Sequence, residues 1–333
     1  MKIVIVTDAW IPQINGVVNT YKNVIPIIEE MGYNVQVVHP YMHGFKRNKL
    51  RAYPEVEYVT NVFYIKQILR ESINKNTLVH IATEGPLGFF ARRYCIKNKI
   101  KFTTCFHTMF PEFIEKRWFI PSYLTYLYFK WFHARSKALF CPTVKIKIHL
   151  ENKGFKNVKV WTRGVDSALF HPSKKTKNNE KYILCVSRIS KEKGLDDFCK
   201  LDYPNKVLVG DGPYLESLKK KYPDVKFLGK KVGEELAKIY ANAEVFVFPS
   251  KADTFGIVIL ESIASGIPVA SYPEPGPREV IQNGKNGFID DDLQIALNNC
   301  LQIDKFSTYL SSDKWSWNKS AQQFIEGLIF NEQ

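Results

Sequence analysis

The sequence predicts an α/β protein built from two successive doubly wound domains. Short apolar runs that are typical of buried parallel strands alternate with helix-like segments, first over residues 3–160 and again from residue 182 onward. Between the two series lies a polar, basic segment, residues 171–182, that has no apolar periodicity and is typical of a linker. At 333 residues the chain is long for one compact domain and suits two.

Composition and charge narrow the class of protein. With 45% hydrophobic and 24% charged residues the chain has an ordinary globular composition. The six cysteines are scattered without a C-x-x-C pair, which argues against a zinc site or a disulfide framework and favours a reducing cytosol. The start of the chain lacks a signal-peptide core, and no stretch is apolar enough to span a bilayer, so we expect a cytoplasmic protein. The net charge of +14 indicates anionic partners or, equally well, lysines that keep the protein soluble.

The first α/β series contains two candidate functional positions. Strands are expected at residues 3–7, 35–39, 78–82, 102–106 and 158–160, with a helix over residues 17–31. Gly16 precedes that helix, where it permits either close approach to a ligand or a simple turn. His107 follows the strand 102–106 at the carboxyl edge of the sheet, where the sites of α/β proteins form, and we favour a functional role for it.

Residues 118–133, WFIPSYLTYLYFKWFH, are dense in aromatic side chains and flanked by basic ones. The pattern favours a helix that packs its aromatic face into the core. The alternative is an interfacial surface, spanning residues 113–135, that meets a lipid or a lipid acceptor.

The second series starts with a strand at 182–186, and two cations follow it. Arg188 comes directly after this strand, and Lys193 stands five residues later, before Gly194. Further strands are expected at 206–209, 226–229 and 245–248, with helices over 234–241 and from Trp315 to Ile329. Gly210-x-Gly212 lacks the third glycine of a dinucleotide fingerprint, and we interpret Asp290 to Asp292 as a helix cap in a solvated turn.

The most informative stretch is FPSKADTFGIVILESIASGIPVA, residues 248–270, which predicts strand, loop, helix, turn and strand. Asp253 or Thr254 is expected to cap the helix and Gly266 to end it. Asp253 and Glu261 stand eight positions apart, or roughly 12 Å along a helix axis. Paired carboxylates of a glycosidase lie about 5 to 9.5 Å apart, so the spacing suits two contacts to one long ligand such as a nucleotide sugar.

Asp253-Thr254-Phe255-Gly256 followed by Glu261 resembles the Glu-x7-Glu signature of the retaining glycosyltransferases of family 4, with Asp253 in place of the usual glutamate. The resemblance extends along most of the chain, and within the family it is nearest to the branch of GDP-mannose-dependent α-mannosyltransferases and bacterial lipid glycosyltransferases. It is carried by these further segments: TDAWIPQINGVVNT, IATEGPLG, FHTMFPEF, WTRGVD, Arg188 to Gly194, VGDGP and the WSW near the end.

The resemblance implies the GT-B fold, with two Rossmann-like domains that face a deep cleft and a C-terminal helix that crosses back to the first domain. Residues 1–170 would bind the acceptor, residues 171–312 the nucleotide sugar, and residues 313–333 would form the returning helix. It implies a retaining, metal-independent transfer of a mannose- or glucose-type hexose from a GDP- or UDP-sugar to a glycan or lipid acceptor.

The resemblance also implies the roles of single residues. His107, Arg188, Lys193 and Asp253 would be catalytic, with Asp253 on the sugar hydroxyls and the two cations on the diphosphate. Glu261 would hold the ribose. The residues expected to contact the donor are Gly16, Arg188, Lys193, Asp253, Phe255, Gly256, Ile257 and Glu261.

Two other functions remain as alternatives. A nucleotide-dependent oxidoreductase would share the Rossmann-like pattern, and a basic nucleic-acid-binding protein would share the charge. We expect no nucleic-acid partner, no metal site and at most a weak, peripheral contact with the cytoplasmic face of an anionic membrane. The donor base, the sugar, the acceptor and the oligomeric state stay open.

Overall fold

The computed structural model describes residues 1–13, 15–50, 53–107, 109–118, 120–176, 180–251, 253 and 255–329. Of Leu50 and of residues 53–56, 113 and 116–118 it describes the backbone alone. Contacts divide the chain into two units: unit 1 comprises Met1–Thr162 with the residues from Trp317 onward, and unit 2 comprises Arg163–Ser316.

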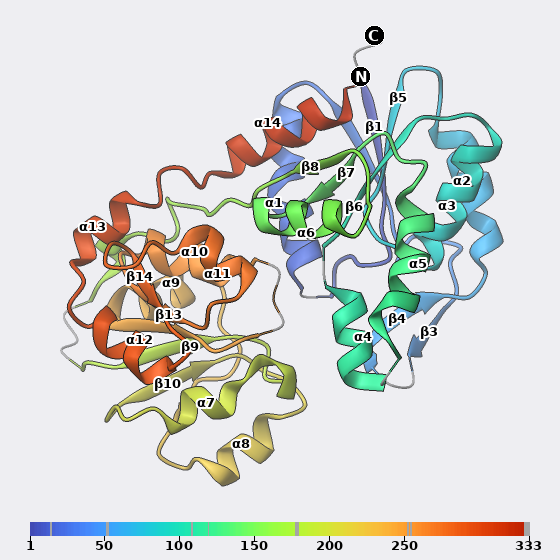
Figure 1. Cartoon of the computed structure of the whole chain (residues 1–333). Helices are drawn as coiled ribbons and strands as arrows, with labels where there is room; N and C mark the ends of the chain where they lie inside the picture. The colour runs from blue at the N-terminus through green and yellow to red at the C-terminus, as the bar shows by residue number, and fades with distance from the viewer. Residues whose placement is uncertain are drawn as a thin grey trace. The chain divides into compact units, whose positions relative to one another are not determined.

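Unit 1 is a parallel six-stranded sheet with helices on both faces (Figure 1). The strands, in the spatial order β2-β1-β5-β6-β7-β8, are β1 (Lys2–Val6), β2 (Asn34–Val38), β5 (Thr77–Ile81), β6 (Phe102–Cys105), β7 (Leu139–Cys141) and β8 (Val158–Val160). Its helices are α1 (Gly16–Glu30), α2 (Ile65–Ser72), α3 (Pro86–Lys97), α4 (Phe110–Trp118), α5 (Ser122–His133), α6 (Val144–Asn152) and α14 (Trp317–Leu328), with a short 3-10 turn at Val62–Tyr64. An antiparallel pair, β3 (Arg47–Leu50) and β4 (Tyr53–Val59), is set apart from the sheet.

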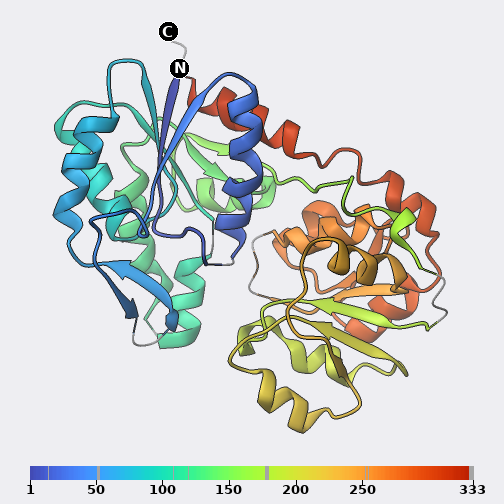
Figure 2. The ribbon, with the colours of Figure 1, turned by 180° about the vertical axis from the view of Figure 1, so that it is seen from behind.

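The alternation of side chains along the strands builds two apolar layers. Val4, Val6 and Val79 pack against α2 and α3 on one face. The opposite face, which carries His80, is covered by α1 and α14, as the two ribbon views show (Figure 2). The strands expected in this half of the chain are confirmed within one residue at each end.

The last helix, α14, packs on unit 1, as expected from the resemblance. The Trp161 indole N–H donates to the Ser320 carbonyl at 3.0 Å, and the ring of Phe324 lies 4.7 Å from the Trp161 ring. Gly327 lies so close to the Phe140 ring that a Cβ would stand 2.2 Å from it, so this position requires glycine. A segment more than 150 residues away in sequence therefore completes the core of unit 1.

Unit 2 is a second parallel six-stranded sheet, in the order β11-β10-β9-β12-β13-β14. Its strands are β9 (Ile183–Val186), β10 (Lys206–Val209), β11 (Lys226–Phe227), β12 (Val245–Phe248), β13 (Val269–Ser271) and β14 (Gly287–Ile289). Its helices are α7 (Leu195–Lys200), α8 (Leu215–Lys221), α9 (Gly233–Asn242), α10 (Ile257–Ala264), α11 (Pro275–Val280), α12 (Leu293–Cys300) and α13 (Lys305–Leu310), with 3-10 turns at Pro172–Lys174 and Lys191–Lys193. Side chains of α9 and α10 cover one face, and those of α7, α8 and α12 cover the other.

The division between the units falls earlier than the expected boundary after residue 170. Val165 and Phe170 are buried in the apolar core of unit 2, so the chain joins this unit at Arg163. The polar segment that follows lies on unit 2 as well: His171 bonds the Tyr309 hydroxyl, and Lys174 pairs with Glu234 at 2.9 Å. Residues 177–179 of the expected linker lie outside the described residues.

Three helix ends can be compared with expectation. Asp292 caps α12, as predicted, by accepting from the backbone N–H groups of Gln294 and Ile295. Gly266 follows the end of α10 with a φ of 75°, also as predicted. The prediction that Asp253 caps α10 is wrong, because the N-cap residue is Gly256. Thr254, the other predicted cap, lies outside the described residues.

Removing the Phe324 ring tests the contribution of α14. Phe324→Ala empties a fully buried site beside Trp161 and is expected to destabilise the protein by about 3 to 5 kcal/mol. Urea unfolding followed by tryptophan fluorescence measures the change. Phe306→Ala, at a side chain that is 67% exposed, is the matched control and should stay within about 0.5 kcal/mol of the original protein. Equal effects of the two substitutions would contradict the packing role of α14.

Candidate active site

The candidate residues fall into two sets, one in each unit. In unit 2, Arg188, Lys193, Asp253 and the start of α10 lie at the carboxyl ends of the neighbouring strands β9 and β12. In unit 1, Gly16 and His107 follow the carboxyl ends of β1 and β6. Ligands of open α/β sheets bind at these edges.

The loop that carries Arg188 is held by the two glycines of the Gly210-x-Gly212 motif. A Cβ on Gly210 would stand 1.8 Å from the Ser187 carbonyl oxygen, and one on Gly212 would stand 2.4 Å from that of Ile189. The Ile189 N–H donates to the Asp211 carbonyl at 2.9 Å. The motif therefore supports the Arg188 loop by close backbone approach. The Arg188 side chain itself is exposed.

The Lys193 ammonium donates to Oδ1 of Asp253 at 2.6 Å. The two residues stand sixty positions apart, and the adjacency of β9 and β12 brings their loops together. Gly194 makes this possible, since its φ is 65° and a Cβ there would stand 2.6 Å from the Pro249 carbonyl oxygen. Both charged side chains are about one-quarter exposed, so the pair is reachable from solvent.

Phe255 and Gly256 form a tight turn at the start of α10. Phe255 is buried against Trp315, with ring centroids 5.7 Å apart. Gly256 has a φ of 82°, and a Cβ there would stand 2.9 Å from the Phe248 ring. No described side chain caps α10, so the backbone N–H groups that begin at Ile257 keep their capacity to bind an anion.

Glu261 lies on the second turn of α10 in a partly buried setting. Its Oε2 accepts from the Tyr240 hydroxyl at 3.0 Å. Burial raises the pKa of the Glu261 carboxyl to about 7, although the Tyr240 hydrogen bond acts in the opposite direction. Because Asp253 precedes the helix, the estimate of a common helix axis for the two acids does not apply to this structure.

Gly16 is the first residue of α1 and faces open space, with no atom within 4 Å of a Cβ placed there. Asn15 caps the helix, and its Oδ1 accepts from the Val18 N–H at 3.0 Å. The turn thus uses Asn15 for the cap, and a side chain at position 16 would project away from the rest of unit 1.

His107 is half-buried, and its Nε2 is hydrogen-bonded to the Tyr21 hydroxyl at 3.2 Å. The same hydroxyl is bonded to Nε2 of His80 at 2.7 Å. Neither Tyr21 nor His80 was predicted from the sequence to lie beside His107. Tyr21 looks like an ordinary core residue of α1, and His80 is one polar residue in the apolar run of β5, which is the single signal that could have drawn attention to it.

Asp8 is a further polar residue at the carboxyl edge of β1 that sequence reasoning passed over. Its carboxylate accepts from the Leu87 N–H at 2.8 Å, from the Gly88 N–H at 3.3 Å and from the Thr83 hydroxyl at 2.8 Å. Burial raises the pKa of Asp8 to about 6. These bonds cap α3, so the structural role of Asp8 accounts for its position.

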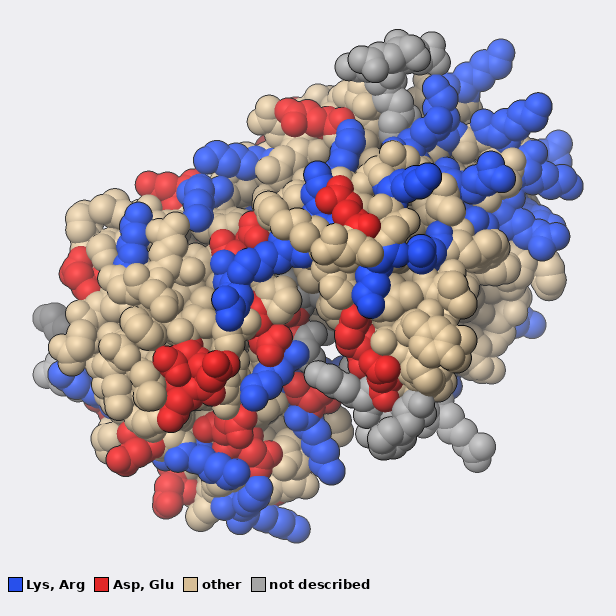
Figure 3. Space-filling model, in the orientation of Figure 1, with Lys and Arg blue, Asp and Glu red and all other residues tan. Residues whose placement is uncertain are grey.

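The charge of the protein is concentrated in one unit. Unit 1 has 25 Lys and Arg against 12 Asp and Glu, a net +13, whereas unit 2 has 22 against 21, a net +1. On the face drawn in Figure 3, basic side chains gather over the part of unit 1 that carries α2 and α3.

Helix α5 of unit 1 presents an exposed apolar face beside its buried one. Tyr126, Phe129, Phe132 and His133 are buried, as the prediction of core packing requires. The opposite side, here called the aromatic face, is formed by Tyr123, Leu124, Leu127, Tyr128 and Trp131, each between 39% and 65% exposed. Core packing is therefore confirmed for the buried side of α5, and the interfacial surface stays a prediction. The side chains of Lys116 and Arg117 lie outside the described part.

The described residues contain neither a membrane-spanning helix nor a metal-binding cluster. No helix there is long and apolar enough to cross a membrane. Within the same ranges, no three His, Cys, Asp or Glu side chains are grouped so that they could hold a metal ion.

The two doubly wound units, each with polar residues at its strand ends, have the architecture of the GT-B fold, and solved structures show the same fold. Anabaena HepE in complex with UDP superposes with a TM-score of 0.72 at 17% identity, covering 98% of this chain and 99% of the other. Sucrose-phosphate synthase from Thermosynechococcus elongatus gives a TM-score of 0.75 at 15% identity, covering 98% and 97%.

The family follows from sequence comparison. Residues 14–169 match the model described as Glycosyltransferase Family 4, and residues 166–296 match the one described as Glycosyl transferases group 1. A GDP-mannose-dependent alpha-mannosyltransferase of Corynebacterium glutamicum is 27% identical over 87% of this chain and 77% of its own length. An alpha-monoglucosyldiacylglycerol synthase of Streptococcus pneumoniae is 26% identical over 87% and 75%. The chain belongs to glycosyltransferase family 4 and is a transferase, and none of these findings supports an oxidoreductase or a nucleic-acid-binding protein.

The raised pKa of Glu261 gives a stability prediction. Between pH 4.5 and about 7 the unfolded chain releases a proton that the folded protein keeps, so the stabilisation present below pH 4.5 is lost as the pH rises through 7. Glu261→Gln has no ionisable carboxyl at this position, so its stability does not fall in this way as the pH rises. At about pH 8 we expect the variant to be more stable than the original by roughly 1 to 3 kcal/mol, with a smaller difference towards acid pH.

Urea unfolding of the ligand-free protein at several pH values measures this difference. Glu216→Gln is the control, because the Glu216 side chain is 76% exposed and should give a small, pH-independent change. If the stability difference between Glu261→Gln and the original protein stayed constant with pH, it would contradict the claim that the folded protein keeps the Glu261 proton up to about pH 7.

Proposed function

We propose that this protein is a retaining hexosyltransferase that uses a GDP- or UDP-linked mannose- or glucose-type sugar. The observation that carries the proposal is the Lys193–Asp253 ion pair beside the start of α10, which no described side chain caps, with Glu261 farther along the same helix. We assign Asp253 to the sugar and Glu261 to the ribose, and Lys193 lies beside the first of these acids. The names of the relatives, which include mannosyl- and glucosyltransferases, support the same substrate class.

The donor would extend along this edge with its diphosphate at the start of α10. The N–H groups that begin at Ile257 suit phosphate oxygens, and the helix dipole favours negative charge there. The loop of Arg188 and Lys193 follows the neighbouring strand and can bring both cations to the same phosphates. Phe255 and Gly256 keep this turn in place because both are tightly packed.

The two acids would hold the two ends of the donor. Asp253 accepts hydrogen bonds from hydroxyls of the sugar, and Lys193, already paired with it at 2.6 Å, links the sugar end to the diphosphate. Glu261 accepts from the ribose hydroxyls while Tyr240 fixes its Oε2. Since ribose hydroxyls donate, the donor would favour the ionised form of Glu261 and lower its raised pKa.

The reaction would proceed with retention and without a metal ion. The bond between the anomeric carbon and the diphosphate oxygen breaks as the acceptor oxygen approaches the same face of the sugar. The acceptor proton passes to the departing phosphate oxygen. The charge that grows on that oxygen is stabilised by Arg188, Lys193 and the helix N–H groups. His107 and Gly16 of unit 1 are assigned to the sugar and to the diphosphate or acceptor, respectively.

Release of nucleotide diphosphate tests the proposed reaction. Each member of a panel of GDP- and UDP-hexoses is incubated with the protein, with and without EDTA. Slow hydrolysis of at least one donor is expected even without acceptor, at a rate that EDTA does not change. If the protein neither bound nor hydrolysed any member of the panel, the proposed donor class would be contradicted. Loss of activity in EDTA would contradict only the metal-independent mechanism.

Removing either cation should slow turnover by about 100- to 1000-fold, because its contact with the diphosphate strengthens as the sugar bond breaks. Steady-state kinetics of Arg188→Ala and Lys193→Ala measure the change, with folding checked by circular dichroism. Arg188→Lys should restore activity in part only, since an ammonium cannot replace a bidentate guanidinium.

Lys191→Ala is the matched control for this prediction. Lys191 lies in the same loop, but its ammonium stands over the Tyr214 ring at 5.7 Å. The control variant should keep near-normal turnover. Folded Arg188→Ala and Lys193→Ala variants that behave like the control would refute the leaving-group role.

For the acceptor, we propose a lipid or lipid-linked glycan that unit 1 meets at an anionic membrane surface of the cytoplasm. The net charge of +13 on this unit favours acidic lipids, and the aromatic face of α5 offers side chains suited to the interface. Lys130, on α5, and Lys153 border this face, and they line a small hollow of about 210 Å³ together with Tyr123, Tyr126 and Leu127.

Vesicle binding tests this surface. The protein should co-sediment with phosphatidylglycerol vesicles at low salt and be released as salt increases. Replacing Tyr123 and Leu127 together by Ser should weaken binding several-fold, whereas Phe306→Ser, an exposed aromatic position of unit 2, should not. Absence of vesicle binding, combined with full activity on a soluble acceptor, would end the membrane proposal.

A further inference from the structure

A row of hydrogen bonds leads from the interior of unit 1 to His107. The Thr103 hydroxyl is bonded to Nδ1 of His80 at 2.7 Å, and Nε2 of His80 is bonded to the Tyr21 hydroxyl at 2.7 Å. Tyr21 is bonded in turn to Nε2 of His107 at 3.2 Å. Three elements supply these groups: β6 carries Thr103, β5 carries His80 and α1 carries Tyr21.

The inner part of this row is sealed from water. Thr103, His80 and Tyr21 have no exposed surface. The rings of Phe324, Phe140 and Trp161 lie 4.9, 5.7 and 6.3 Å from the His80 ring, and Phe324 comes from the returning helix α14. In such a setting each polar hydrogen needs a protein partner, because an unpaired one keeps the full cost of its desolvation. Burial also keeps His80 neutral, by lowering its pKa to about 3.

A neutral His80 has one ring proton, so the donors of the row can all point towards His107 or all point away from it. In the first, Thr103 donates to Nδ1 of His80, the Nε2–H of His80 donates to Tyr21, and the Tyr21 hydroxyl donates to Nε2 of His107. In the second, every bond is reversed, and the Thr103 hydroxyl proton needs another acceptor. Within the described part of the chain, His80 is the one hydrogen-bond partner of the Thr103 hydroxyl. The first orientation leaves no buried hydroxyl proton unpaired and is therefore favoured.

We propose that Thr103, His80 and Tyr21 are positioning residues that fix the tautomer of His107. They direct the Tyr21 proton to Nε2 of His107, so that the neutral ring carries its own proton on Nδ1 and can donate from there. The use of that donor in sugar transfer rests on the function proposed above for His107, but the tautomer itself does not.

The tautomer can be observed directly by NMR. In protein labelled with ¹⁵N-histidine, protonated and unprotonated ring nitrogens resonate in separate ranges, and His107→Gln identifies the signals of residue 107. In alkaline buffer, where neutral imidazole prevails, we expect the proton of His107 on Nδ1. Tyr21→Phe removes the donor to Nε2 and should shift His107 towards the Nε2–H form, which imidazole side chains favour in water. Thr103→Val should cause a partial shift in the same direction.

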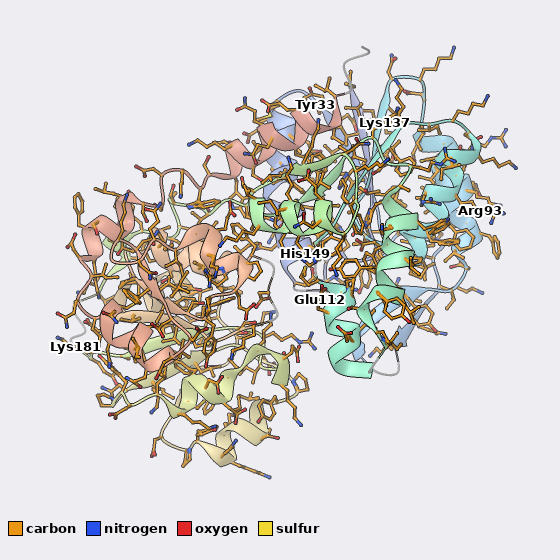
Figure 4. The ribbon with its side chains drawn as sticks, in the orientation of Figure 1. Tyr33, Arg93, Glu112, Lys137, His149 and Lys181 are labelled. Atoms are coloured by element: carbon orange, nitrogen blue, oxygen red, sulfur yellow. The ribbon has the colours of Figure 1, made fainter. Side chains whose placement is uncertain are left out.

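Tyr126→Phe is the matched control. The Tyr126 hydroxyl is also bonded to a histidine, Nε2 of His149, at 2.8 Å, and it donates to Glu112. Glu112 and His149 lie close together in unit 1 (Figure 4). This variant loses the same hydroxyl from a buried tyrosine of the same unit and should leave the His107 signals unchanged.

The outcomes are distinct. An Nε2–H tautomer in the original protein, or an unchanged tautomer in both Tyr21→Phe and Thr103→Val, would overturn the inference. If the tautomer shifts as expected, Tyr21→Phe should also lower kcat about 10-fold or more at unchanged donor KM. Normal turnover in His107→Gln would contradict the proposed role of His107 in transfer and leave the tautomer assignment standing.

Discussion

The site of unit 2 depends on the close contact between the loops that follow β9 and β12. These strands are neighbours in the sheet although about sixty residues separate them. The contact requires Gly194, whose missing side chain lets the Lys193 loop lie against the Pro249 carbonyl. Gly210 and Gly212, in the loop after β10, pack closely against the backbone of Ser187 and Ile189. Because the Lys193–Asp253 pair spans these loops, we expect a larger residue at Gly194 to move the cation away from the acid.

The proposed role of unit 1 depends on a different feature, the hydrogen bonds that hold the His107 ring at the sheet edge and determine which ring nitrogen carries its proton. The polar row from Thr103 to His107 lies inside an apolar shell, and the shell is completed by Phe324 of α14. The returning helix therefore does more than stabilise the unit. It also excludes water from the bonds that hold Tyr21 and His80.

Much of this architecture could be predicted from the sequence, because buried parallel strands are short apolar runs that end at polar loops. The strands at 158–160, 206–209 and 245–248 have the predicted bounds, and the class of enzyme follows from motif order. What the sequence could not provide were pairings across distant segments. Nothing near Glu261 indicates Tyr240, nothing near His107 indicates His80, and the polar segment from His171 resembled a linker although it lies on unit 2. The strand order that brings such residues together is a property of the whole sheet.

The central claim is that this enzyme transfers a hexose with retention from a nucleotide diphosphate donor held in unit 2. The most direct measurement is the anomeric configuration of the first product, determined by NMR before any equilibration, with an α-linked donor. The account predicts an α-linked product, because the acceptor attacks the face from which the diphosphate departs. A β-linked product would contradict it, since inversion requires a base on the opposite face of the sugar and a different arrangement of the site.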